Sequence, residues 1–132
     1  MKILLDTHAW IWWHADPGKL SKKALRAIKT HAPNEGILLS AISVWELCKL
    51  VEKGRIALSL SPDLWIREAL KRHGCRVIPL RPSIAYHSTI LPQPFHHDPA
   101  DQIIVATARE ENAVIVTKDG LIQAYPHVQT LW

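Results

Sequence analysis

Short, largely apolar runs recur along the chain, with longer segments of different character between them. They are KILL (residues 2–5), ILLS (37–40), RVIPL (76–80) and AVIVT (113–117). Runs of this length without polar alternation are typical of strands buried on both faces of a parallel sheet. The run VQTL (128–131) adds a predicted edge strand. These runs limit the chain to folds with a buried central sheet.

The segments between the runs have a helical apolar period or a helix-favouring composition. They cover residues 8–15, 21–31, 41–53, 62–73, 82–90 and 99–112. Strands that alternate with helices predict an α/β domain with three layers around a central, mostly parallel sheet. There is no internal repeat or low-complexity tract, so we expect a single domain over residues 1–132.

The composition is that of an ordinary globular domain, with 48% apolar and 21% charged residues. No apolar run approaches the roughly 20 residues of a membrane span, and the first aspartate comes too early for a signal peptide. We therefore expect a cytoplasmic protein without a membrane partner. Cys48 and Cys75 are isolated in the sequence, which predicts two buried thiols and neither a disulfide framework nor a zinc site.

Five acidic residues occupy positions that this fold would gather at one end of the sheet. Asp6 directly follows the first run, and Asp119 follows the run that ends at residue 117. Glu46 lies about one turn into the helix after ILLS, while Asp98 and Asp101 open the helix that follows a Pro-rich loop. The carboxyl ends of parallel strands and the helices that follow them meet at one edge. We expect these carboxylates to converge there.

The pair in HHDPADQIIVATA (residues 96–108) also has a purely structural interpretation. Asp98 is a preferred N-cap residue, Pro99 suits the first helical position, and Asp101 occupies the third position of a capping box. Both carboxylates also favour the positive end of the helix dipole. The pair alone therefore does not distinguish a helix start from a metal site.

The other acidic residues have structural alternatives of the same kind. Asp6 could cap the helix over 8–15, Glu46 could close a capping box with Ser43, and Asp119 could be a turn or cap residue. Together these alternatives are weaker, because two unit charges about 4 Å apart repel by on the order of 4 kcal/mol at an effective dielectric near 20. Clustered carboxylates must therefore take up protons or bind cations.

Carboxylate oxygens without Cys are the ligands of hard ions such as Mg²⁺ or Mn²⁺. Bound ions of this kind can activate a water and stabilise the leaving oxygen in phosphodiester hydrolysis. The net charge of +4 suits a nucleic-acid partner, or equally reflects solvated Lys and Arg on helix faces. Two basic groups could hold RNA phosphates beside an acidic centre: Lys22, Arg26 and Lys29 on one helix face, and Lys49, Lys53 and Arg55 after Glu46.

Four segments resemble, in order and spacing, the PIN-domain nucleases, specifically the VapC-like toxins of type II toxin–antitoxin pairs. They are LLDTHAWIWW, ISVWELCKLVEKGRI, HHDPADQIIVATA and VIVTKD, and the similarity covers nearly the whole chain. The resemblance implies an endoribonuclease that uses Mg²⁺ or Mn²⁺, with one or two ions bound. In this chain the family's acidic quartet corresponds to Asp6, Glu46, Asp101 and Asp119.

The resemblance also implies supporting residues and partners. Asp98 corresponds to an auxiliary carboxylate, and the family's hydroxyl positions, which hydrogen-bond the ligand carboxylates, correspond to Thr7, Ser43 and Thr117. The implied partners are an RNA substrate, a cognate antitoxin and a second copy of the chain in a homodimer. One departure is Gln102, where the family often has Arg or Lys.

The sequence leaves alternative roles open for two loop histidines and for three tryptophans. His96 and His97 could touch substrate or a soft metal, although two loop histidines more often face solvent. Trp10, Trp12 and Trp13 cover more than one side of a short helix. They either lie buried under neighbouring helices or form an exposed patch for a dimer mate or antitoxin, with base stacking as a third role.

Other classes fit the sequence less well. A haloacid-dehalogenase-like phosphatase would have a second aspartate at position 8, where this chain has His8, and a receiver-like phosphoacceptor would need an aspartate in RVIPLRPS. A PIN-fold nuclease with a housekeeping role in RNA processing remains an alternative. So does a catalytically silent PIN domain that only binds RNA or protein.

Overall fold

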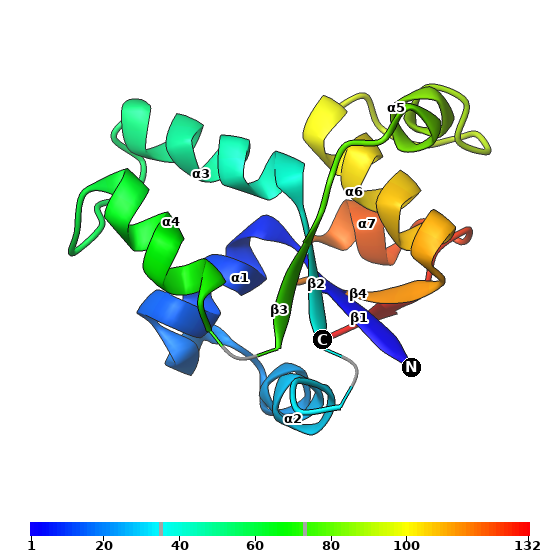
Figure 1. The fold of residues 1–132 in the computed structure, drawn as a ribbon. Coiled ribbons are helices and arrows are strands. Elements are labelled where there is room, and N and C mark those ends of the chain that lie inside the picture. Colours follow the sequence, from blue (N-terminus) through cyan, green and yellow to red (C-terminus); the bar gives the residue numbers. More distant parts are fainter. Residues whose placement is uncertain (35, 73) are drawn as a thin grey trace.

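A parallel sheet forms the centre of the computed structural model, which describes residues 1–34, 36–72 and 74–132 (Figure 1). In the described part of the chain, the sheet has five strands in the order β3-β2-β1-β4-β5, and every pairing between neighbours is parallel. The strands are β1 (Lys2–Leu5), β2 (Ile37–Ser40), β3 (Cys75–Ile78), β4 (Ala113–Val116) and β5 (Thr130–Leu131). The expected sheet is therefore confirmed.

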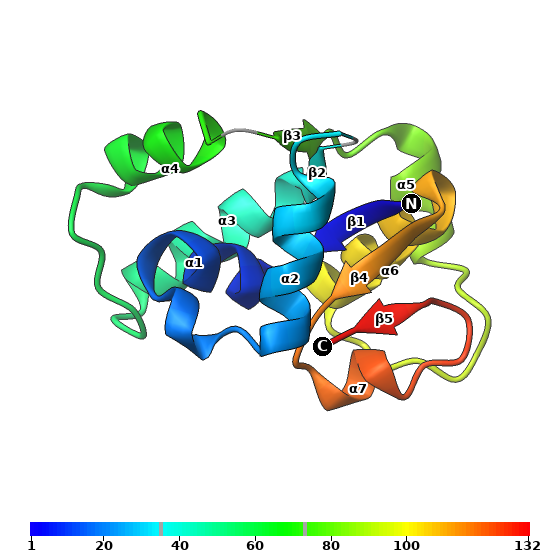
Figure 2. The ribbon, with the colours of Figure 1, turned by 90° about the horizontal axis from the view of Figure 1, so that it is seen from below.

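Helices cover both faces of this sheet (Figures 1 and 2). One apolar cluster joins the face that carries Ile3 and Leu5 to α1–α4, and a second joins the face that carries Leu4 to α5–α7. Consecutive strand residues thus point to opposite layers, as the pleat requires. The helices are α1 (Thr7–Ala15), α2 (Lys22–His31), α3 (Ala41–Glu52), α4 (Pro62–Leu70), α5 (Pro82–Ser88), α6 (Pro99–Glu111) and α7 (Gly120–Gln123), with a 3₁₀ turn at η1 (Pro17–Lys19). The three-layer α/β/α architecture is confirmed.

The expected element boundaries differ from the observed ones in a few places. β3 is an edge strand that is only partly buried, and it ends at Ile78 because Pro79 has no N–H for the sheet ladder. The helix expected over 62–73 ends at Leu70, and its expected last residue lies outside the described residues. Short α7 was not expected, and it begins directly after Asp119.

The expectations for tryptophan and cysteine had different outcomes. Trp10 and Trp13 are buried, and Trp12 packs half-buried against the same core, so burial is the correct alternative for these three residues. The expectation of two buried thiols was wrong: Cys48 is exposed because it follows the buried Leu47 on α3 and faces away from the core. Cys75 is half-buried on the edge strand. No described helix is long and apolar enough to cross a membrane.

Candidate active site

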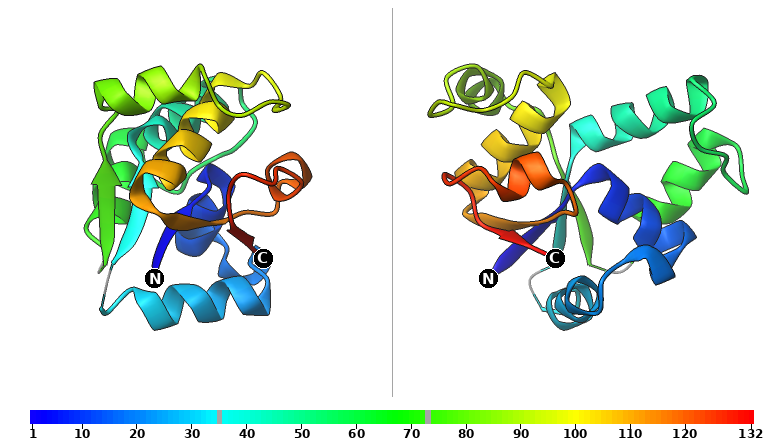
Figure 3. Two further views of the ribbon diagram at one scale, coloured as in Figure 1. Left: turned by 90° about the vertical axis from the view of Figure 1, so that its right-hand side faces the viewer. Right: turned by 180° about the vertical axis from the view of Figure 1, so that it is seen from behind.

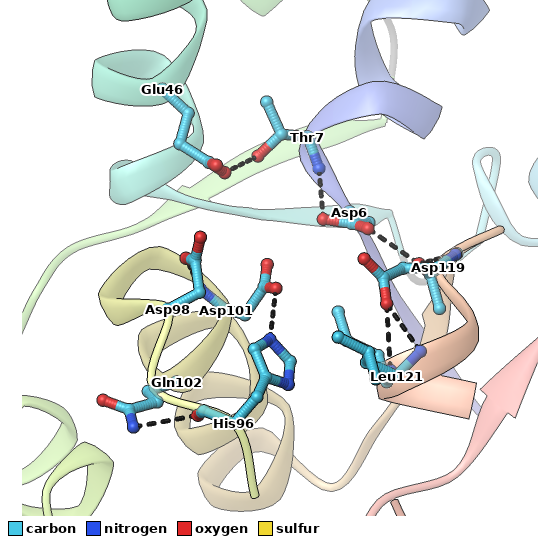
Figure 4. Close-up of polar contacts among 11 residues, drawn as sticks. Asp6, Thr7, Glu46, His96, Asp98, Asp101, Gln102, Asp119 and Leu121 are labelled. Carbon is cyan, nitrogen blue, oxygen red and sulfur yellow. Dashed lines mark hydrogen bonds and ion pairs between the residues drawn. The ribbon is translucent and has the colours of Figure 1, made fainter. Parts of the chain in front are cut away.

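Carboxylates from four separate segments meet at the carboxyl edge of the sheet (Figure 4). Asp6 follows β1, Asp119 follows β4, Glu46 lies on α3, and Asp98 and Asp101 lie at the start of α6. We call these five residues the acidic cluster. They are close enough to repel one another: Asp6, Asp98 and Asp101 all raise the pKa of Glu46, and Asp6, Asp98 and Asp119 all raise that of Asp101. The structure therefore brings all five predicted carboxylates together.

Asp6 caps α1 and also faces the acidic cluster. Its Oδ1 accepts a hydrogen bond from the backbone N–H of Thr7 at 2.8 Å, and its Oδ2 accepts one from the Thr117 hydroxyl at 2.7 Å. The residue is only 8% exposed, and this burial raises the pKa of its carboxyl group. The capping alternative is correct, but it uses one oxygen and leaves the other to a hydroxyl that holds the carboxylate in place.

Glu46 is held by a pair of buried hydroxyls. The Thr7 hydroxyl hydrogen-bonds to Glu46 Oε1 and lies 2.8 Å from Ser43 Oγ. A hydroxyl has one proton, so when Thr7 donates to the ionised Glu46, Ser43 must donate to Thr7. Burial, followed by the neighbouring carboxylates, raises the pKa of Glu46 to about 7. The alternative of a capping box with Ser43 was wrong, because Ser40 is the N-cap of α3.

Asp98 and Asp101 have different roles at the start of α6. Asp98 Oδ1 accepts the backbone N–H of Asp101 at 3.0 Å, so Asp98 is the N-cap. Asp101 does not complete a capping box, because its Oδ2 lies 2.7 Å from His96 Nε2 and pairs with that ring. Burial raises the pKa of Asp101 to about 6, with the hydrogen bond from His96 acting in the opposite direction.

Asp119 and Thr117 connect the end of β4 to the acidic cluster. Asp119 Oδ1 accepts the backbone N–H groups of Leu121 and Ile122, at 2.8 and 3.1 Å, and so caps α7. Thr117 is fully buried; its Oγ1 accepts the Asp119 N–H at 3.0 Å and donates to Asp6. The Thr117 hydroxyl therefore links Asp6 and Asp119, which follow the neighbouring strands β1 and β4.

The donor chemistry of the acidic cluster fits a hard divalent cation, since every candidate ligand atom is a carboxylate oxygen. Within the described ranges, however, no three His, Cys, Asp or Glu side chains are already grouped to hold an ion. Carboxylates close enough to repel would be drawn together by a cation, which turns that repulsion into attraction.

The two loop histidines behave differently from each other. His97 is exposed, as expected of a loop histidine, whereas the His96 side chain is 21% exposed and lies against Asp101. The position of His96 is explained by its contact with Asp101, without any contact with substrate or a soft metal. The sequence interpretation missed this contact between His96 and a predicted metal ligand. Both residues lie in the same loop, so spacing alone could not separate them.

The two basic groups lie in different places. The group of Lys22, Arg26 and Lys29 is on α2, which Figures 1 and 3 show on the far side of the sheet from the start of α6. The structure therefore does not bring these residues beside the acidic cluster, contrary to expectation. On α3, the helix that carries Glu46, Lys49 Nζ lies 3.3 Å from Glu52 and 5.9 Å from the ring centre of Trp45. Lys53 and Arg55 are exposed just beyond that helix.

Comparisons with known proteins identify the family of this fold. The sequence model of the PIN domain matches residues 3–127. Ribonuclease VapC22 of Mycobacterium tuberculosis is 39% identical, with 98% of each chain covered. Among solved structures, VapBC2 from Rickettsia felis, bound to a DNA fragment from its promoter, superposes with a TM-score of 0.75, at 18% identity over 99% of this chain and 98% of that one.

A toxin–antitoxin complex from Klebsiella pneumoniae gives a TM-score of 0.66 at 23% identity, over 96% of this chain and 95% of that one. At such identities the structural matches establish the fold alone. The family match and the closer sequence relative each extend over nearly the whole chain. This chain therefore belongs to the PIN-domain family.

Proposed function

We propose that this protein is a metal-dependent endoribonuclease and the toxin of a toxin–antitoxin pair. The observation that carries the proposal is the convergence of five carboxylates from four segments at one edge of the sheet. The similarity to a protein named as a ribonuclease supports the reaction. The toxin role follows the resemblance of the sequence segments to VapC-like toxins, since the solved complexes share only the fold with this chain.

In this proposal the quartet of Asp6, Glu46, Asp101 and Asp119 binds one or two Mg²⁺ or Mn²⁺ ions. Such ions supply an activated water and stabilise charge on the phosphate during phosphodiester hydrolysis. The chain's own contribution is to position these carboxylates at one edge of the sheet and to give them hydrogen bonds that partly offset the effect of burial on their charge. The Thr117 hydroxyl does so for Asp6, and hydrogen bonds to a carboxylate favour its charged form.

The proposed partners are RNA, a cognate antitoxin and a second copy of the chain. Of the predicted RNA contacts, Lys49, Lys53 and Arg55 remain the better placed, because they belong to or follow the helix that carries Glu46. Trp45 precedes Glu46 and is 54% exposed, so it adds an aromatic surface on which a base could stack.

Cleavage of RNA by the purified protein tests the reaction. We expect activity with Mg²⁺ or Mn²⁺, loss of activity in EDTA, and a decrease of at least about a hundredfold for Asp101→Asn, as for removal of other groups that stabilise transition-state charge. Asp63→Asn is a matched control, because Asp63 is exposed on α4 and outside the acidic cluster. Cleavage that survives EDTA as well as Asp6→Asn and Asp101→Asn would contradict the reaction.

Expression in bacterial cells tests the toxin role. We expect the wild-type chain to arrest growth and Asp101→Asn to leave growth normal, because a toxin of this kind acts through RNA cleavage. A wild-type protein that binds RNA or a partner without cutting RNA would instead indicate the silent binding domain. Cleavage without growth arrest would favour the housekeeping nuclease.

A further inference from the structure

His96 makes a direct contact with one proposed metal ligand. Its Nε2 lies 2.7 Å from Asp101 Oδ2, and the two side chains are 21% and 17% exposed. The contact is therefore largely shielded from water, unlike the surface ion pairs on α3 and α4, whose side chains are 41–72% exposed. A shielded hydrogen bond to a charged group is stronger than an exposed one, so this contact can fix the position of a carboxylate.

The segment that presents His96 is itself firmly anchored. Phe95 is buried and its ring centre lies 4.2 Å from that of His96 and 4.6 Å from that of Tyr125. The Tyr125 hydroxyl donates to the backbone oxygen of Pro92 at 2.6 Å. Although these residues belong to an irregular loop, apolar packing and a hydrogen bond tie the loop to the core. The imidazole therefore packs against an anchored ring while its Nε2 contacts Asp101, and Figure 4 shows this second contact.

Gln102 adds a second brace. Its side-chain Nε2 donates to the backbone oxygen of His96 at 3.1 Å, across the first turn of α6. This is the position at which the resemblance led us to expect Arg or Lys. In this chain the residue after Asp101 brings no charge, but it secures the backbone of the residue that holds Asp101.

The chemistry of the contact fixes the direction of donation. An ionised Asp101 carboxylate can only accept a hydrogen bond, so His96 Nε2 must carry the proton. Donation to Oδ2 leaves Oδ1 of the same carboxylate available to a cation. Partners of this kind orient metal ligands, and their loss typically lowers metal affinity 10–100-fold.

We propose that His96, braced by Gln102 and Phe95, is a positioning residue that fixes the Asp101 carboxylate for metal binding. This inference rests on the proposed function, since it assumes that Asp101 is a ligand. His96 acts through Asp101 and does not itself touch the metal or the RNA. The neighbouring His97, which is exposed, has no such part.

The proposal can be tested by measuring the Mn²⁺ affinity of the metal-free protein and of a series of variants by isothermal titration calorimetry. We expect His96→Ala to lower the Mn²⁺ affinity about tenfold. His96→Gln places an amide donor near the former Nε2 and should recover most of the affinity. Gln102→Ala should cause a smaller loss, and His97→Gln should bind as the wild type does. Equal affinities for wild type and His96→Ala, or equal losses for the Ala and Gln variants, would overturn the proposal.

The ¹⁵N spectrum of the histidine rings gives a readout that needs no metal and no substitution of His96. We expect a protonated Nε2 in the wild-type protein, with a shift that changes in Asp101→Asn and not in Asp63→Asn. An unprotonated Nε2, or a signal that ignores Asp101→Asn, would overturn the proposal even if His96→Ala failed to fold. If the wild-type protein bound no Mn²⁺, the proposed function would fail, while this spectrum would still show whether His96 holds Asp101.

Discussion

Buried titratable groups lie at both ends of α1: carboxylates near its N-terminus and a histidine near its C-terminus. At the N-terminal end, Asp6 and Thr7 belong to a region where three carboxylates have raised pKa values. Toward the C-terminal end, His14 lies among tryptophan rings, and burial lowers its pKa to about 4. We call this second region, Trp10, Trp13, His14 and Trp65, the aromatic cluster. In both regions burial disfavours the charged form, but the polar surroundings differ.

The carboxylates of the acidic cluster accept hydrogen bonds from neighbouring residues, whereas two polar atoms of the aromatic cluster have no hydrogen-bond partner among the described residues. Asp6 and Glu46 each receive hydrogen bonds, from Thr117 and Thr7 respectively. Among the described residues, Trp10 Nε1 and His14 Nε2 are buried without a hydrogen-bond partner. In the aromatic cluster, apolar packing must therefore offset the cost of burying these two unpaired polar atoms. In the acidic cluster, the ionised carboxylates repel one another. This difference predicts that the aromatic cluster contributes more to the stability of the fold than the acidic cluster does.

The largest expected effect tests the aromatic cluster. Trp10 is fully buried, and its ring meets that of Trp65 edge-on at 5.3 Å between centres. We expect Trp10→Ala to lower the free energy of unfolding by about 4 kcal/mol, from lost burial and the cavity left behind. Denaturant unfolding measures this change.

The exposed Trp45 provides the matched control on a neighbouring helix. Trp45→Ala should change the free energy of unfolding by less than about 0.5 kcal/mol, since surface substitutions rarely do more. A similar loss of stability for the two variants would show that burial in the aromatic cluster does not stabilise the fold.

The sheet could be predicted from the sequence because the strands coincide with short runs of largely apolar residues. Runs such as ILLS are largely apolar, and the ends of the first and fourth runs placed Asp6 and Asp119 at one edge without any knowledge of distances. Local pattern was less informative at the edge of the sheet. β3 resembles the central strands in composition, and only the strand order shows that one side has no neighbour and is partly exposed.

The fine structure of the acidic cluster depends on contacts between distant segments. No spacing rule distinguishes His96 from His97, because the difference is set by how Phe95 packs on Tyr125, 30 residues away along the chain. The bond between Thr117 and Asp6 joins residues 111 positions apart. Similarly, α2 carries its basic residues to the opposite side of the sheet, which helical spacing could not reveal.

The second prediction concerns the acidic cluster in metal-free protein. The pKa of Glu46 is raised to about 7 from the usual 4.5, so the folded chain binds more protons than the unfolded chain between these values. Stability should therefore fall as pH rises through this window. Glu46→Gln cannot ionise, and we expect its stability relative to wild type to increase by about 2 kcal/mol between pH 4.5 and 8, after allowance for solvent screening.

Added Mn²⁺ should reverse this difference, because the ion stabilises the folded wild type by binding and binds Glu46→Gln less well. Glu52→Gln, on the exposed C-terminal turn of α3, is the control and should follow the wild-type pH profile. A stability difference between Glu46→Gln and wild type that is constant with pH would contradict the raised pKa of Glu46, which burial and then the neighbouring carboxylates cause.

The last prediction concerns the aromatic cluster, where the expected change of stability with pH has the opposite sign. Burial, and then the nearby Arg72, lower the pKa of His14 to about 4 from 6.5, so the unfolded chain binds more protons between these values. The stability contributed at this site is present above pH 6.5 and is lost as pH falls toward 4. His14→Phe keeps an aromatic ring but cannot titrate. We expect its stability relative to wild type to rise by about 2 kcal/mol as pH falls through this window, measured by denaturant unfolding. The subtraction cancels every group common to both proteins, so a slope of the same sign as that of Glu46→Gln would contradict the lowered pKa of His14.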